Sequence, residues 1–291
     1  MSIHEYINKY LNYVEGRGRT LSTKEAYKHD LTKFSDYLIT LKIDNIEKIN
    51  SVLIEDYLFE LKLSSATKER RRVIIKNFFE YLYRRKYITD NPTVGIDSIK
   101  VNQRRPEYLS SEQRETFLKT IEQQSTPYYK ERDLMLARLL LDTGLRRAEV
   151  TGLNVSDIDL SKFSLRVKRK GNREEYVRIH PDLVGNIKKY LKLIHRDENQ
   201  PLFLSKKGQR LSASSIWHII KSYSRKAGFN EKVTVHSLRH SFATALLQES
   251  VPLPYIQALM GHKSSQTTAR YIHIQDKDLI EIFNKVRFGR R

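Results

Sequence analysis

Five short segments between residues 144 and 271 carry the side chains with the clearest chemical potential. They are Gly144-Leu145-Arg146-Arg147-Ala148-Glu149, Lys170-Gly171-Asn172, His236-Ser237-Leu238-Arg239-His240, Gly261-His262 and Thr267-Thr268-Ala269-Arg270-Tyr271. Transfer of a phosphodiester needs cations on the non-bridging oxygens, an in-line nucleophile, and a proton for the leaving oxygen. Arginine, lysine and histidine side chains followed by a tyrosine hydroxyl supply all three. The pattern therefore predicts phosphoryl transfer to tyrosine.

The same segments contain few acids. Many phosphoryl-transfer enzymes bind divalent metals through clustered carboxylates, whereas Glu149 is the one acid in these segments. A planar guanidinium can hold two phosphate oxygens at once. His236 and His240 have the i, i+4 spacing of a zinc pair, but Ser237 breaks the His-Glu-x-x-His pattern and no third ligand is evident. We therefore expect a site without a metal ion or another cofactor.

Each segment also has an ordinary structural interpretation when it is taken alone. Gly144-Leu145-Arg146 and Gly261-His262 fit helix ends, and Lys170-Gly171-Asn172 fits a hairpin turn. Tyr271 is one of 17 tyrosines. The functional prediction therefore depends on the combination of segments.

Composition points to an anionic partner. The 291-residue chain has 53 Lys and Arg against 34 Asp and Glu, a formal charge of +19. Nucleic acid is the leading candidate, and an anionic membrane surface is a weaker one. No apolar run approaches the roughly 18 residues of a membrane span, and the N-terminus does not resemble a signal peptide. The absence of Cys excludes disulfides and thiolate catalysis. We expect a cytoplasmic, nucleoid-associated protein without membrane contact.

The first hundred residues are expected to form helices. Ser22 and Glu25 fit a capping box, followed by an apolar stripe of Tyr27, Leu31, Phe34, Leu38 and Leu41. Ser64 or Ser65 is expected to cap a second helix with the stripe Ile74, Phe78, Tyr81 and Leu82, and Asn91-Pro92 ends it. The polar side of that helix is expected to carry Lys68, Arg70, Arg71, Arg72 and Lys76. These residues form either a solvated surface or a DNA contact, and the net charge favours DNA.

The residues from 98 to 106 are poor in apolar side chains and include Arg104 and Arg105, so we expect a basic linker that contacts DNA. Beyond a helix start at Ser110-Ser111, the second domain has mixed periodicity. Helices are expected at 111–124, 130–142, 182–195 and 213–227, two strands at 164–167 and 175–179, and interrupted helices over 236–286. The expected fold class is mainly α with a small β-sheet.

Over nearly its whole length the chain resembles the tyrosine recombinases of the phage integrase family. Three segments match its boxes in order and spacing: Thr143 to Glu149, His236 to Thr244, and Leu259-Met260-Gly261-His262 followed by Thr267-Thr268 and Tyr271. The resemblance implies a helical core-binding (SAM-like) domain over 1–98, a basic linker over 99–106, and a catalytic domain of the DNA breaking-rejoining type over 107–291. Met260, Arg178 and Ala148 depart from common family residues. The sequence therefore leaves open whether the recombinase is chromosomal or borne by a mobile element.

The resemblance also implies a role for each matching residue. Tyr271 would be the nucleophile, and Arg146 and Arg239 would hold the scissile phosphate. Lys170 would protonate the departing 5′-oxygen, while His236 and His262 would hydrogen-bond the phosphate. Glu149 would brace the site, and His240 would be structural.

The family pattern further implies double-stranded DNA with inverted-repeat half-sites and a homotetramer that acts through a Holliday junction. A C-terminal helix over about 276–287, with Leu279, Ile282, Phe283 and Val286 as its apolar stripe, would dock either on its own domain or in a neighbouring protomer. A second recombinase, an accessory protein or a translocase is left undecided. Two rivals also stay open: a type IB topoisomerase that uses a similar residue set, and a catalytically silent DNA-binding regulator.

Overall fold

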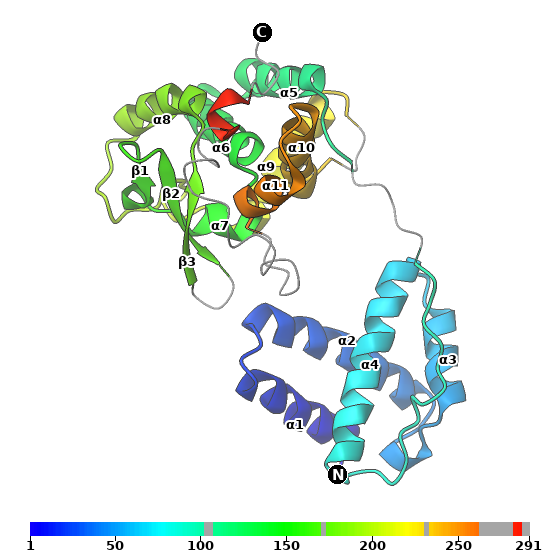
Figure 1. The fold of residues 1–291 in the computed structure, drawn as a ribbon. Helices are drawn as coiled ribbons and strands as arrows, with labels where there is room; N and C mark the ends of the chain where they lie inside the picture. The colour runs from blue at the N-terminus through cyan, green and yellow to red at the C-terminus, as the bar shows by residue number, and fades with distance from the viewer. Residues whose placement is uncertain (102–106, 170–172, 230–232, 262–281, 287–291) are drawn as a thin grey trace. The chain divides into compact units, whose positions relative to one another are not determined.

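The computed structural model of the chain describes residues 1–101, 107–169, 173–229, 233–261 and 282–286. It consists of two compact units, residues 1–104 and 105–291, and the division falls in the stretch expected to be a linker. Figure 1 shows that the first unit is helical and that the second combines helices with one small sheet. The predicted fold class, mainly α with a small β-sheet, is confirmed.

Four α-helices build the first unit: α1 (Ile3–Gly16), α2 (Leu21–Thr40), α3 (Ser51–Glu60) and α4 (Ser65–Arg84), with a 3-10 turn, η1, at Ile46–Lys48. Helix α4 contacts each of the other three. The apolar stripe expected on α4 is buried, as are Leu31, Phe34 and Leu38 on α2. Together these side chains form the core of the unit.

The two predicted caps have different outcomes. Ser64 is the N-cap of α4, and its hydroxyl accepts the backbone N–H of Thr67. The capping box expected from Ser22 and Glu25 is wrong. Thr20 precedes α2 with extended backbone angles and accepts the N–H of Thr23, so Ser22 lies inside the first turn and cannot cap it.

Two of the arginines expected on the polar side of α4 are buried instead. Arg71 donates to the Tyr57 hydroxyl (2.9 Å), and its Nε lies 3.4 Å from a carboxylate oxygen of Asp30, which is also buried. Arg72 is paired with Glu69 through two bonds of 2.8 Å. The expectation for these two side chains is wrong, because their positions on the 3.6-residue helix flank the apolar stripe. A nearby carboxylate makes burial of each guanidinium tolerable.

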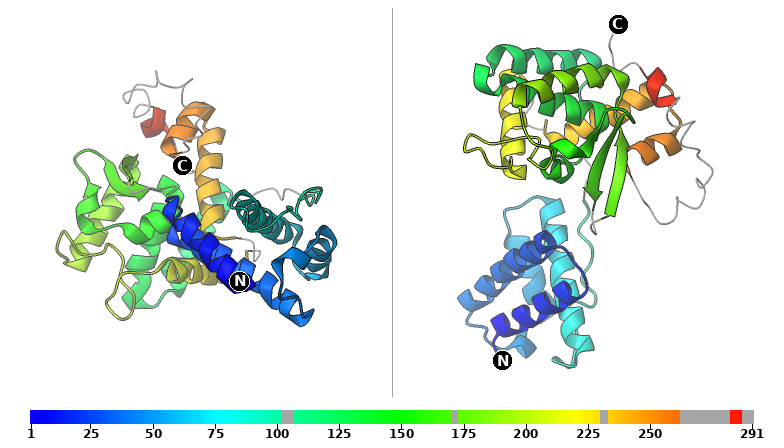
Figure 2. Two further views of the ribbon diagram at one scale, coloured as in Figure 1. Left: turned by 90° about the horizontal axis from the view of Figure 1, so that it is seen from below. Right: turned by 90° about the vertical axis from the view of Figure 1, so that its left-hand side faces the viewer.

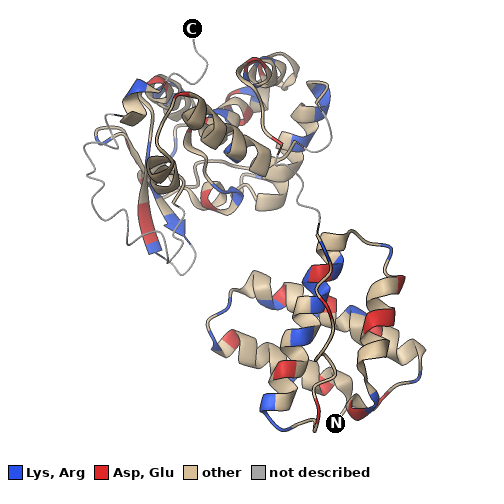
Figure 3. Cartoon of the chain, turned by 45° about the vertical axis from the view of Figure 1, so that its right-hand side comes forward, with Lys and Arg blue, Asp and Glu red and all other residues tan. Residues whose placement is uncertain are grey.

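The remaining basic residues of α4 are more accessible. Arg70 and Lys76 are exposed, although Arg70 also reaches Asp30 at 3.0 Å. Lys68 is half-buried and donates to the carbonyl of Phe59. Basic and acidic residues both occur along the helices of this unit (Figure 3). DNA contact by these residues stays a prediction, and Arg104 and Arg105 lie outside the described residues.

In the second unit, helices lie beside one antiparallel sheet. The helices are α5 (Ser111–Gln124), α6 (Pro127–Thr143), α7 (Arg147–Gly152), α8 (Pro181–Ile194), α9 (Ala213–Lys226), α10 (Val235–Gln248) and α11 (Leu253–Leu259), with a 3-10 turn, η2, at Val155–Asp157. The strands β1 (Ile158–Asp159), β2 (Ser164–Arg169) and β3 (Arg173–Arg178) pair in that order, with Leu165 opposite Val177. Figure 2 shows them as one layer beside the helices. Sequence periodicity missed β1, which has only two residues.

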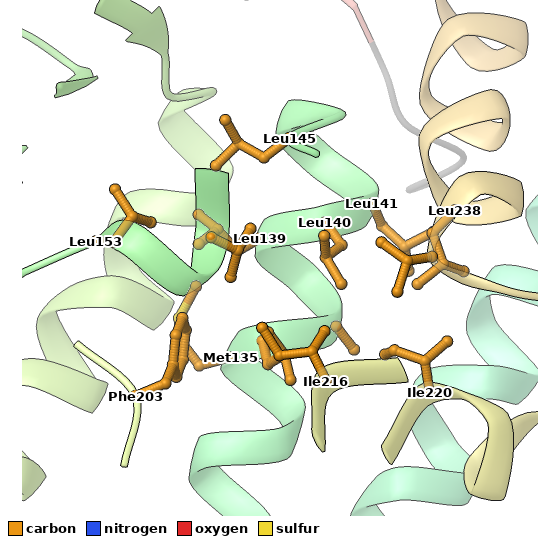
Figure 4. Close-up of a cluster of buried hydrophobic side chains, with 14 of the residues drawn as sticks. Met135, Leu139, Leu140, Leu141, Leu145, Leu153, Phe203, Ile216, Ile220 and Leu238 are labelled. Atoms are coloured by element: carbon orange, nitrogen blue, oxygen red, sulfur yellow. The ribbon is translucent and has the colours of Figure 1, made fainter. Parts of the chain in front are cut away.

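Helix α6 forms the centre of this unit, where it contacts α5, α8 and α10. Its last five residues, Leu139–Thr143, are all buried. Figure 4 shows Leu139, Leu140 and Leu141 beside Ile216 and Ile220 of α9 and Leu238 of α10. A helix end that is covered on every side is held firmly by packing, so the turn that follows α6 starts from a fixed point.

A smaller core joins α10 and α11 to the described part of the C-terminal segment. Phe283 and Val286 are buried with Phe242, Leu246 and Ile256. In this structure the segment therefore packs on its own unit. The other residues of the helix expected at 276–287 lie outside the described ranges. Within those ranges, none of the helices combines the length and apolar content needed to cross a bilayer.

Because Arg71 is buried and Lys76 is exposed, we expect replacement of Arg71 to lower stability and replacement of Lys76 to change it little. Replacing Arg71 with Ala leaves Asp30 without one of its buried cationic contacts, so we expect the free energy of unfolding of the first unit to fall by about 3 kcal/mol. The exposed control Lys76→Ala should change it by about 0.5 kcal/mol or less. Hydrogen exchange of α2 and α4 in the full chain measures both. Equal protection in the two variants would contradict the structural role of Arg71.

Candidate active site

The site begins where α6 ends. Gly144 closes the helix with φ 62° and ψ 23°, a left-handed conformation that favours glycine. A Cβ at this position would lie 2.5 Å from the ring of Phe242, so the close approach of α10 also requires glycine. Leu145 then turns into the core, and Arg146 follows as the N-cap of α7. Packing of α6, α7 and α10 thus fixes the backbone that carries Arg146.

One carboxylate holds both the main chain and the side chain of Arg146. Glu149, only 5% exposed, accepts the Arg146 backbone N–H at 2.8 Å and a guanidinium N–H at 2.7 Å. The Arg146 side chain is still 40% exposed. The guanidinium is therefore held in place on one side and accessible to a ligand on another.

Arg239 approaches the same place from α10. It is only 7% exposed and donates to two backbone carbonyls, those of Gly144 and of Met260, the latter at 2.7 Å. Burial lowers the pKa of Arg239 to about 10, and the positive charges of Arg146 and Arg169 add to this effect. The group stays protonated at neutral pH, but its charge is held in an unfavourable environment that an anion would improve.

Two histidines lie on α10, one turn apart, on either side of Arg239 in sequence. His236 and His240 are both exposed. The protein still covers part of the His240 ring, and this desolvation lowers its pKa, as do the charges of His236 and Arg239. This shared influence indicates that the three side chains are electrostatically close, whereas the role of each histidine stays a prediction.

A further arginine, which the sequence did not single out, belongs to this cluster. Arg169, the last residue of β2, has a guanidinium nitrogen 3.4 Å from a carboxylate oxygen of Glu149, and its Nε lies 2.8 Å from an oxygen of Glu175. It also donates to the carbonyls of Met260 and Gly261. The alternation of side chains along a strand is the sequence signal that could have identified Arg169. Leu165 and Val167 point into the core, and Arg169 lies on the same face of the strand.

The structure therefore brings together Arg146, Glu149 and Arg239 as expected from the sequence, and adds Arg169. Lys170, His262 and Tyr271 lie outside the described residues. Among the described residues no group of three or more His, Asp or Glu side chains is placed to hold a metal ion. Arg146 and Arg169 contact Glu149, and Arg169 also contacts Glu175, whereas Arg239 donates to backbone carbonyls. These three guanidinium groups outnumber the two carboxylates, so positive charge exceeds negative charge. Such a cluster can bind a phosphate through charge-assisted hydrogen bonds.

Comparison with known proteins agrees with this geometry. Residues 107–278 match the family model described as phage integrase family, and residues 7–86 match that of the phage integrase N-terminal SAM-like domain. Tyrosine recombinase XerD of Staphylococcus epidermidis is 32% identical over 288 residues, which cover 96% of this chain and 97% of that protein. Tyrosine recombinase XerC of Thermodesulfovibrio yellowstonii is 33% identical over 294 residues, covering 96% and 95%.

Solved structures share the fold. XerH site-specific recombinase, in a post-cleavage complex with its palindromic difH substrate, superposes with a TM-score of 0.73 at 26% identity, covering 94% of this chain and 82% of that one. Lambda integrase (75–356), as a dimer bound to a core site, gives a TM-score of 0.75 at 20% identity, with coverage of 92% and 97%.

The arginine cluster predicts specific stabilisation by a phosphate-like anion. Inorganic phosphate near ten times its dissociation constant should raise the melting temperature of the second unit by about 3–6 °C. Arg146→Gln should lose most of this increment, whereas Arg147→Gln, an exposed neighbour on α7, should keep it. Calorimetry in phosphate and in chloride of equal ionic strength provides the measurement. The same increment in both variants would show that phosphate acts only as a general salt.

Proposed function

Because this chain belongs to the phage integrase family of tyrosine recombinases, enzymes that cleave and rejoin DNA in site-specific recombination, we propose that it acts through a covalent tyrosyl intermediate. The Tyr271 oxygen attacks the scissile phosphorus, the bond to the 5′-oxygen breaks, and a 3′-phosphotyrosyl ester forms. The observation that carries the proposal is the convergence of Arg146 and Arg239 on one positively charged cluster braced by Glu149.

The cations of the cluster perform the electrostatic part of the reaction. Arg146, partly exposed, and Arg239, buried, are suited to hold the non-bridging oxygens and to stabilise the charge that builds up in the transition state. A tyrosine hydroxyl ordinarily has a pKa of about 10, so a positive environment also favours its deprotonation. His236 and His262 hydrogen-bond the phosphate in this scheme, and His236 assists removal of the proton.

Cleavage also needs a proton for the leaving group, and rejoining reverses the same steps. Lys170 gives a proton to the departing 5′-oxygen, and a 5′-hydroxyl from the partner duplex later attacks the phosphotyrosyl bond and releases Tyr271. One phosphodiester is exchanged for another through an ester of similar energy, so the exchange needs no ATP. Glu149 acts in this scheme through its contacts with Arg146 and Arg169.

Recombination between two sites requires assembly on DNA. We expect pairs of protomers on inverted half-sites, and two such pairs in a tetramer that forms a Holliday junction. The palindromic DNA bound by the XerH relative supports the inverted arrangement. The exposed residues Arg70 and Lys76 are candidates for phosphate contact by the helical domain, with Lys68 beside them, and Arg104 and Arg105 are candidates in the linker.

The C-terminal segment is the proposed link between protomers. Phe283 and Val286 occupy an apolar site formed by α10 and α11 of their own unit. Because each protomer carries the same site, the segment of one protomer can fill that of its neighbour with equivalent contacts. Assembly would then replace intramolecular packing by intermolecular packing at little cost in buried area.

A suicide substrate tests the covalent step. When a duplex nicked near the scissile phosphate is cleaved, the short fragment that carries the new 5′-hydroxyl diffuses away. Without that hydroxyl the strand cannot be rejoined, so the protein stays attached to DNA. We expect wild-type protein to give an adduct that survives denaturation and Tyr271→Phe to give none, while both bind the same duplex. Binding without an adduct by wild type would indicate a silent regulator. Relaxation of plasmids that lack the site would indicate a topoisomerase.

A further inference from the structure

Arg169 connects two segments that are distant in sequence and that each precede a proposed catalytic residue. It is the last residue of β2 and pairs with Arg173 across the hairpin. Its guanidinium donates to the carbonyls of Met260 at 3.2 Å and Gly261 at 3.3 Å, at the end of α11. Lys170 follows Arg169 in the chain, and His262 follows Gly261.

The contact between Arg169 and the end of α11 is close enough to dictate a residue type. Gly261 has φ +61°, and a Cβ built there would overlap the guanidinium of Arg169. The guanidinium therefore lies directly against the glycine backbone. Its side chain is only 10% exposed, so it is a packed part of the unit and not a surface charge.

Arg169 is also joined to both phosphate-binding arginines through shared acceptors. One oxygen of Glu149 lies 2.7 Å from an Arg146 nitrogen and 3.4 Å from an Arg169 nitrogen. The Met260 carbonyl accepts from Arg169 and, at 2.7 Å, from Arg239. Neutralisation of Glu149 is thus divided between two cations, which leaves Arg146 less tightly engaged than in an isolated buried pair.

We propose that Arg169 is a positioning residue that ties the end of β2 and the end of α11 to the Glu149 carboxylate. Consecutive Cα atoms are about 3.8 Å apart, so fixing Arg169 restricts where Lys170 can be placed, and the same holds for Gly261 and His262. Arg169 itself donates no proton and holds no phosphate. This inference rests on the proposed function, because it assigns Arg169 its effect through protonation of the leaving oxygen.

The leaving group provides the test. Replacing the scissile 5′-oxygen with sulfur gives a leaving thiolate that needs no proton, because a thiol is much more acidic than an alcohol. We expect Arg169→Gln to cleave the ordinary phosphodiester at least tenfold more slowly than wild type, and the sulfur substrate within about threefold of wild type. Arg169→Lys, which keeps the charge but loses the planar fork, should be intermediate on the ordinary substrate. Lys168→Gln, an exposed neighbour on β2, is the matched control and should match wild type on both.

The same substrate pair separates failure of this inference from failure of the proposed function. Lys170→Ala should be slow on the ordinary substrate and rescued by sulfur. If Lys170→Ala is not rescued, the proposed proton donor is wrong. If Lys170→Ala is rescued but Arg169→Gln is not, the positioning role of Arg169 is wrong. DNA affinity and melting temperature of each variant are measured first, so that a folding defect is recognised.

A stability measurement tests the contact without reference to activity. Gly261→Ala should lower the melting temperature of the otherwise wild-type protein, because the new methyl group meets the Arg169 guanidinium in a strained backbone. In an Arg169→Ala background the same substitution should cost at least one third less, leaving only the backbone strain. An equal cost in both backgrounds would show that the two residues are not in contact and would overturn the proposal.

Discussion

The rest of the site depends on the contacts that the buried carboxylate of Glu149 makes with arginines. It fixes the backbone and the guanidinium of Arg146 and also attracts Arg169. Arginines gathered this closely repel one another, and at least one acid is needed to hold them in a folded protein. Glu149 supplies that attraction from a position that solvent scarcely reaches. It holds the cluster together without cancelling its charge.

The surrounding fold stabilises this cluster of charges, which is partly removed from water. Arg239 is desolvated and its pKa is lowered, yet two backbone carbonyls accept its hydrogen bonds. Those carbonyls belong to Gly144 and Met260, at the ends of α6 and α11, where helices leave acceptors unsatisfied. The large core around α6 supplies the stability that a strained, charge-rich site removes. An incoming phosphate would compensate the excess positive charge directly.

Sequence reasoning predicted the parts of the fold that follow from periodicity and end signals. The helices after Ser64 and Ser110 begin where expected, and Gly144 ends α6, although α4 ends at Arg84 and not at Asn91-Pro92. It failed where tertiary partners decide the outcome. Arg71 was expected on the polar side of α4, because nothing in its local sequence indicates that Asp30, forty-one residues earlier, would be buried beside it. Ser22 was expected to cap α2 because Glu25 completes the capping-box pattern, whereas Thr20, which can also cap a helix, is the observed N-cap.

The site shows the same division. Arg146, Glu149 and Arg239 were found because their motifs are recognisable in sequence, and the fold gathers them. Arg169 was missed because its importance comes from Glu149, Glu175 and the carbonyls at the end of α11, which the fold alone brings to it. Alternation along β2 indicates the direction of its side chain but not its partners.

The central claim, that protein cations neutralise the phosphate, is tested most directly by removing the charge from the phosphate itself. A methylphosphonate at the scissile position replaces one charged oxygen with a neutral methyl group. The wild-type to Arg146→Ala ratio of cleavage rates should be about a hundredfold or more on the ordinary phosphate. On the methylphosphonate it should fall below about tenfold, because less charge then needs neutralising. An unchanged ratio on the two substrates would show that Arg146 does not act on the phosphate charge and would contradict the account.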